Sequence, residues 1–146
     1  MSASSHVIPG SWLALASEPD WLSAEHLEQL NFRIVDGSGE PFGILKPHEL
    51  ASAPMRPRQL YHYDGVEDLA ALAVRLMMAV ITAHPFEQGN KRTGFAAAEL
   101  FLEANGWLLD ISDFEDIADE IIEAAENASL EADLVELFGR NLIEMA

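Results

Sequence analysis

The chain has 146 residues, about half of them hydrophobic, which is enough for one domain with one core and leaves little room for a second. It carries 25 acidic against 8 basic residues, and this net charge of −17 excludes general nucleic-acid binding, which needs clustered cations to neutralise phosphates. A membrane span is excluded because no apolar run is long enough. Together with the lack of a signal-peptide pattern and of cysteine, this predicts a cytoplasmic protein with one domain over residues 1–146. The acidic surface is either simply solvated or faces a basic partner.

The first part of the chain is expected to change from irregular to helical. Prolines and a glycine make residues 1–20 irregular, and Ser23 is a typical N-cap for a helix that follows. Glycine and proline predict a loop over residues 36–43, and a short helix is expected around residues 48–53. Residues 54–64, PMRPRQLYHYD, contain two prolines and are interpreted as an exposed, partly extended segment with a short β-hairpin flap before residue 65.

From Val66 onward the apolar residues recur at helical spacing. They predict a helix over residues 66–84, which Pro85 ends because the residue before a proline disfavours the α region. A second helix is expected to run from its N-cap, Asn90, to a C-cap at Asn105. Amphipathic helices are expected over residues 113–127, with a solvated acidic face, and 130–145. The expected fold class is therefore all-α, a compact helical bundle.

The loop between the two central helices, HPFEQGNKR at residues 84–92, combines groups that suit an anion. The unpaired N–H groups and the dipole at a helix start attract negative charge, and Gly89 lets a ligand come close to the backbone. Lys91 and Arg92 place two cations where the helix dipole disfavours them, which a bound anion would offset. His84 is the side chain best matched to proton transfer near neutral pH. The loop is predicted to be a phosphate cradle beside a base, rather than a helix corner with a capping histidine.

This segment resembles the motif of the Fic/Doc superfamily, H-x-F-x-(D/E)-(G/A)-N-(G/K)-R. Its N-K-R-T form, followed by FAAAELFLEANG, is most similar to the Doc (death-on-curing) branch, and the resemblance covers residues 22–140. It implies a helical bundle that transfers AMP, or in the Doc branch a phosphate, from ATP or another nucleoside triphosphate to a protein hydroxyl, with Mg²⁺ as cofactor. For the Doc branch it implies a toxin that acts on translation elongation factor Tu. A separate small antitoxin would inhibit it, since the chain has no copy of the inhibitory pattern (S/T)-x-x-x-E-(G/N).

The resemblance also assigns roles within the loop. His84 would be the general base on the target hydroxyl, and Phe86 the structural anchor that fixes the loop on the core. The anion hole and the phosphate contacts would come from four residues at the start of the second helix, with the Asn side chain as one donor: Gly89, Asn90, Lys91 and Arg92. Such a protein chiefly positions the reacting groups and stabilises charge.

Two positions depart from the family pattern. Gln88 stands where the acidic metal ligand is expected, and an amide oxygen without negative charge should hold Mg²⁺ more weakly. A small loop shift would be needed to bring the adjacent Glu87 in. Phe95 stands where AMP-transferring members carry a second arginine, which favours phosphate over AMP transfer. The alternative to an enzyme is a weak or inactive binding module that retains the anion site.

Outside the loop, Arg56 and Arg58 lie where the family has a flap that aligns the target chain by strand pairing, unless they are ordinary solvated arginines. The segment Tyr61-His62-Tyr63 either lines a groove or packs structurally. The remaining histidines are interpreted as surface residues, and no cluster suggests zinc: they are His6, His26 and His48.

Overall fold

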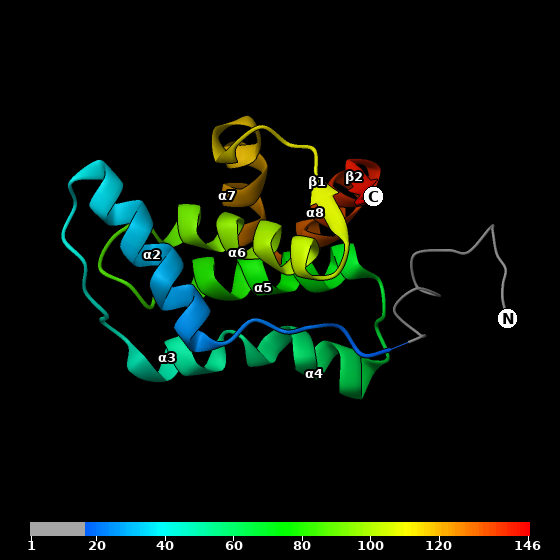
Figure 1. Ribbon diagram of the computed structural model, residues 1–146, viewed down its shortest axis with the longest axis horizontal. Helices are drawn as coiled ribbons and strands as arrows, with labels where there is room; N and C mark the ends of the chain where they lie inside the picture. Colours follow the sequence, from blue (N-terminus) through cyan, green and yellow to red (C-terminus); the bar gives the residue numbers. More distant parts are fainter. Residues whose placement is uncertain (1–16) are drawn as a thin grey trace, which may run out of the picture.

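Two helices side by side form the centre of the computed structural model, which describes residues 17–146 (Figure 1). They are α5 (Leu69–Ala83) and α6 (Asn90–Ala104), joined by the short loop that carries the predicted phosphate cradle. α2 (Ala24–Ser38) packs on α6, and α3 (Pro47–Ser52) and α4 (Met55–Asp64) lie along α5. The all-α prediction is therefore confirmed. No helix in this part of the chain is long and apolar enough to cross a membrane.

The helix α5 is almost wholly buried. Its N-cap Asp68 accepts a hydrogen bond from the Ala70 N–H at 3.0 Å, and its C-cap is His84, directly before Pro85. The predicted apolar stripe faces the core, although the helix begins three residues later than the stripe. α5 contributes the largest share of the core because neighbours pack around it on several sides.

Gly94 sets the close approach of α6 to α5. A Cβ at this position would lie 2.9 Å from the Met77 carbonyl oxygen and 2.9 Å from Ile81 Cγ1. No larger residue fits here without moving one helix. The α6 N-terminus, and with it the loop, is therefore positioned directly by the core.

The interpretation of residues 54–64 as extended was wrong, because they form α4. Pro54 is the N-cap and Pro57 lies in the first helical turn. Backbone N–H groups at these positions make no hydrogen bond within a helix, so a proline, which has no N–H, removes none. The two prolines therefore start a helix instead of preventing one. No hairpin forms between residues 17 and 65, where the β-type pairing is a single bridge from Ile44 to Phe86 in the loop.

The C-terminal part covers the other side of α5. It comprises, in order, β1 (Trp107–Leu109), η2 (Phe114–Ile117), α7 (Ala118–Glu126), η3 (Ala128–Leu130), α8 (Glu131–Arg140) and β2 (Leu142–Glu144). The strands pair antiparallel with Leu108 opposite Ile143, so the last predicted helix stops short of residue 145. Arg75 of α5 pairs with Glu131, which ties α8 to the central helices.

Gly94→Ala should destabilise the protein by about 1–3 kcal/mol, because the added methyl overlaps Met77 and Ile81. Gly139→Ala in α8 is the matched control, since a Cβ there meets nothing within 4 Å and alanine should gain up to about 1 kcal/mol. Urea unfolding measures both free energies. Equal stabilities for Gly94→Ala and the parent would show that the helices do not depend on this contact.

Candidate active site

His84 occupies a strained turn at the edge of a cavity. It is the one non-glycine residue with positive φ between residues 17 and 146, at 51°, and its N–H still donates to the Val80 carbonyl at 3.1 Å. Pro85 prevents the helix from continuing through His84, and His84 ends α5 in the left-handed conformation that is common at the C-terminus of a helix. The His84 side chain is exposed.

Two hydrogen bonds between the Asn90 side chain and the Phe86 backbone close the loop. The Phe86 N–H donates to Asn90 Oδ1 at 3.0 Å, and Asn90 Nδ2 donates to the Phe86 carbonyl at 2.9 Å. Phe86 is 1% exposed, so its ring is buried in the core. The predicted N-cap role of Asn90 was wrong, because Gly89 is the N-cap and Asn90 is the first helical residue. Its amide serves the loop, so anion binding falls to backbone donors.

The start of α6 has free donors because its N-cap has no side chain. Gly89, at φ 75°, makes no side-chain cap, and across residues 17–146 no acceptor is paired with the N–H groups of Asn90, Lys91 and Arg92. A Cβ on Gly89 would also lie 3.2 Å from Val35 Cγ1. Three unpaired N–H groups at the positive end of a helix dipole make an anion site.

Asn31 fixes this loop from α2, and sequence reasoning missed it. It is fully buried, and its Nδ2 donates to the Gln88 carbonyl at 2.7 Å and to Thr93 Oγ1 at 3.1 Å. The available signal was its spacing: Asn31 lies four residues from both Leu27 and Val35, on the buried face of the helix. A buried polar residue at such a position needs hydrogen-bond partners, and here they come from the loop.

Of the two cations, Arg92 has an acidic neighbour. Its Nη2 donates to Glu40 Oε1 at 2.6 Å, and Ser38 Oγ donates to the same oxygen at 2.5 Å. The Arg92 hydrogen bond, followed by that of Ser38, lowers the pKa of Glu40, so the pair persists until the pH falls through that lowered pKa. A guanidinium has five N–H donors, so Arg92 can contact Glu40 and a phosphate together. Lys91 is half-buried and has no ion pair in the described part of the chain.

A cavity of about 340 Å³ brings the predicted residues together. Its lining is His84, Glu87, Gln88, Gly89, Asn90, Lys91 and Arg92 from the loop, with Phe114 and Glu115 from η2. Phe86 lies beneath it in the core. Glu115 was not foreseen, because the sequence gives no sign that η2 returns to the loop.

The oxygens in this cavity suit a hard cation with few protein ligands. Gln88 lines it as expected, and Glu115 supplies a carboxylate on the η2 side. The Glu87 carboxylate lies against Gly43: a Cβ added to Gly43 would be 2.8 Å from Glu87 Oε1. Residues 17–146 hold no group of three histidine or carboxylate ligands, so Mg²⁺ bound here would depend largely on nucleotide phosphates.

The segment that pairs with the loop is Gly43–Lys46. The N–H groups of Leu45 and Lys46 donate to the Pro85 carbonyl at 2.8 and 3.1 Å, and the Glu87 N–H donates to the Gly43 carbonyl at 2.8 Å. Ile44, between these contacts, has no backbone partner among the residues described. Its N–H and C=O point away from the loop and form a short free edge.

The other predicted residues lie elsewhere. Arg56 lines a separate cavity with Arg75, and the Arg58 guanidinium lies 5.8 Å from the Trp21 ring centre. Tyr61 packs edge-on against Trp21 at 5.7 Å, which confirms the packing alternative for this residue. His26 and His48 are exposed, as predicted, and His6 lies outside the described residues.

Comparison with known proteins gives one family. The Fic/DOC family model matches residues 21–102, more than half of the chain, from just before α2 to near the end of α6. The match includes the whole loop and the segment that pairs with it. No curated protein matches the chain.

Asn31→Ala should weaken nucleotide binding severalfold and lower stability by about 1–3 kcal/mol, because the Gln88 carbonyl in the loop and the Thr93 hydroxyl in α6 both lose their hydrogen bond from the Asn31 amide. Asn105→Ala is the matched control: its side chain bonds Asp20 and Phe101 at the far end of α6. It should lower stability and leave binding unchanged. Calorimetric titration with ATP, beside thermal unfolding, measures both. Equal ATP affinity in the two variants would contradict this role of Asn31.

Proposed function

This chain belongs to the Fic/DOC family, and we propose that it is a Doc-like kinase that transfers a phosphate from ATP to a hydroxyl of a target protein. The observation that carries the proposal is the open start of α6. Three free N–H groups and two cations face one cavity, and an exposed histidine lies on its rim. A polyphosphate satisfies all these donors at once, and the rim is open to a second protein.

The proposed transfer uses the chain's own groups in simple roles. His84 accepts the proton of the target hydroxyl as the hydroxyl oxygen attacks the terminal phosphorus. The bond from that phosphorus to the bridging oxygen breaks, and ADP leaves with the electron pair. The N–H groups at the α6 start, with Lys91 and Arg92, stabilise the negative charge on the phosphate oxygens. His84 then returns its proton to solvent.

Mg²⁺ fits this site as a partner of the nucleotide. Gln88 and Glu115 would hold it together with phosphate oxygens of the nucleotide. The ion would supply charge neutralisation on the phosphates. In this proposal Glu115 adds to the cavity a carboxylate that offsets the neutral charge of Gln88.

The environment of Phe95 supports phosphate rather than AMP transfer. Phe95 is 4% exposed and packs edge-on near Phe114 and Phe138, at 6.4 and 6.5 Å. One turn after Arg92, α6 therefore offers a core side chain instead of a second cation. AMP transfer, which the resemblance associates with an arginine here, remains the second outcome of the labelling test below.

Elongation factor Tu as target and a small antitoxin as inhibitor are part of the proposal, and both rest on the resemblance to the Doc branch. The free edge of Ile44 supports a docked target, because an extended chain can pair there with the segment that contacts the loop. We therefore assign the flap to Gly43–Lys46, which contacts the loop. A target contact by Arg56 and Arg58 on α4 stays a prediction.

A binding module without catalysis is the second candidate. Gln88 favours it, since the cavity lacks the carboxylate that the family motif places in the loop. Such a module would bind nucleotide through the α6 start and transfer nothing.

Incubation of the protein with elongation factor Tu and ATP labelled at the γ or the α position separates these candidates. We expect γ label alone on the target, lost in His84→Ala by at least about a hundredfold because the base is removed. His48→Ala, an exposed histidine outside the site, should retain full transfer. An α label would show AMP transfer instead. No label at high Mg²⁺, with ATP still bound, would establish the binding module.

Gln88→Asp should raise the transfer rate and lower the Mg²⁺ concentration that half-saturates it, because a carboxylate binds Mg²⁺ more strongly than an amide. Gln59→Asp, on the exposed side of α4, adds the same charge outside the cavity and should change neither value. Steady-state kinetics over a Mg²⁺ series measure both. If Gln88→Asp changes neither the transfer rate nor the half-saturating Mg²⁺ concentration, the lack of a carboxylate at position 88 does not limit the reaction.

A further inference from the structure

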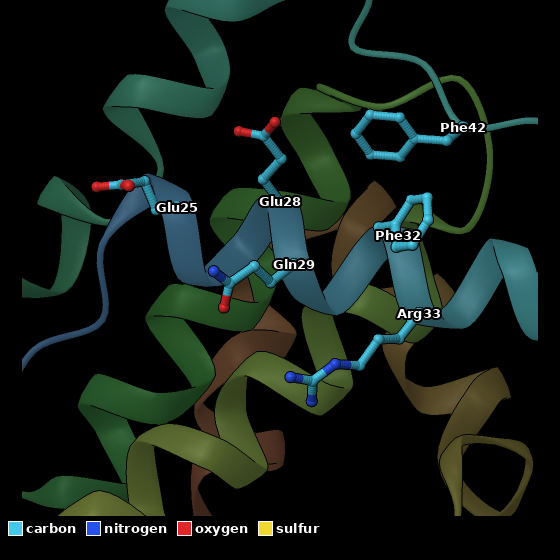
Figure 2. Close-up of a pocket in the computed structure, with 6 residues that line it drawn as sticks. All are labelled: Glu25, Glu28, Gln29, Phe32, Arg33 and Phe42. Carbon is cyan, nitrogen blue, oxygen red and sulfur yellow. The ribbon is translucent and has the colours of Figure 1, made fainter.

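A second hollow, of about 450 Å³, opens on the outer face of α2 (Figure 2). It is lined by Glu25, Glu28, Gln29, Phe32, Arg33 and Phe42. We call these six residues the α2 groove. Phe42 belongs to the segment that leads from α2 to the flap, so the groove borders the site already described.

Two aromatic rings form the floor of this groove and contact each other instead of the core. Phe32 is 51% exposed and Phe42 39%, and their ring centres lie 5.6 Å apart in an edge-on arrangement. Neither ring joins the hydrophobic core cluster. Single exposed apolar residues are common, but a paired aromatic floor within a hollow is typical of a surface that another molecule covers.

Acidic side chains precede the rings along the helix. Glu25, Glu28 and Phe32 follow one another at spacings of three and four residues, so they lie along one face of α2. Figure 2 shows Glu28 directed to the side on which Phe42 lies, while Arg33 extends the other way. Neither glutamate has an ion pair among the described residues. A ligand that matches this face carries positive charge near the start of α2 and an apolar group near its end.

The groove is continuous with the flap. Phe42 directly precedes Gly43, whose carbonyl accepts the Glu87 N–H at 2.8 Å, and Ile44 next to it offers the free backbone edge. A polypeptide that pairs with Ile44 can also contact Phe42, which lies only two residues earlier in the same segment. A small ligand would not span both contacts, whereas an extended chain would.

We propose that the α2 groove docks the target polypeptide of the transfer reaction, which presents one large apolar side chain to Phe32 and Phe42 and one or two basic side chains to Glu25 and Glu28. This rests on the proposed function and adds to it a chemical specificity for the target. The excess of acidic residues in the chain supports a basic ligand, because it attracts cationic segments from solution.

Binding is measured apart from chemistry in the His84→Ala protein, using short fluorescein-labelled synthetic peptides. The probe carries two lysines, a phenylalanine and an acceptor serine, and its controls replace the lysines by glutamates or the phenylalanine by serine. Fluorescence anisotropy should show the probe binding at least about tenfold more tightly than either control, a difference of about 1.4 kcal/mol. Equal binding of the probe and its controls overturns the proposal.

Matched variants locate the contact. Phe32→Ser, Phe42→Ser and the pair Glu25→Gln with Glu28→Gln should each weaken probe binding at least about threefold, by loss of apolar contact or of charge attraction. Tyr63→Ser, at a side chain 83% exposed on α4, and Glu123→Gln on α7 should leave it unchanged. Groove variants that bind the probe as tightly as these controls do would overturn the proposal. Groove variants that instead abolish self-association in sedimentation would also overturn it, because they would identify a second copy of the chain as the occupant.

The same variants distinguish this inference from the proposed function. In the protein with His84 intact, Phe32→Ser should raise the KM for the target and leave ATP affinity and kcat unchanged. Selective peptide binding without any transfer would overturn the proposed function and keep the docking surface. Transfer that proceeds with an unchanged KM in Phe32→Ser would keep the proposed function and overturn the docking surface.

Discussion

The site depends on the clasp between the Asn90 side chain and the Phe86 backbone. These two hydrogen bonds hold the loop in a compact turn over the buried Phe86 ring. Because the Asn90 amide is used in this way, the N-cap position falls to Gly89, which has no side chain to fill the helix start. The clasp thus leaves three N–H groups open toward the cavity, and it positions His84 across from them. An ordinary Asn N-cap would have closed one of these donors.

The surrounding helices keep this arrangement rigid. Asn31 binds the loop from α2, Gly94 allows α6 to approach α5 closely, and the Gly43–Lys46 segment pairs with the loop from the other side. Asn31 and Gly43–Lys46 contact the loop from different parts of the chain, while Gly94 fixes the spacing of the two helices that the loop joins. Under the proposed function, the start of α6 is therefore preorganised before a nucleotide arrives, which is the condition for strong electrostatic stabilisation of a transferred phosphate.

Local signals made part of this structure predictable. Pro85 ended α5 and the apolar stripe identified its buried face, while the residues of the loop motif identified the cavity lining. The sequence misled where one residue type has two structural uses. Prolines can break a helix or begin one, as in α4, and an asparagine can cap a helix or clasp a loop, as Asn90 does. Asn31, Glu40 and Glu115 escaped prediction because their roles arise from contacts between segments distant in the sequence.

Amide chemical shifts measured during titration with ATP show whether nucleotide phosphates bind the open start of α6. We expect the largest shifts at the N–H groups of Asn90, Lys91 and Arg92. The start of α5 serves as the internal reference, because Asp68 already caps it through the Ala70 N–H. Shifts of similar size at both helix starts, or no response at residues 90–92 while ATP binds elsewhere, would contradict the account.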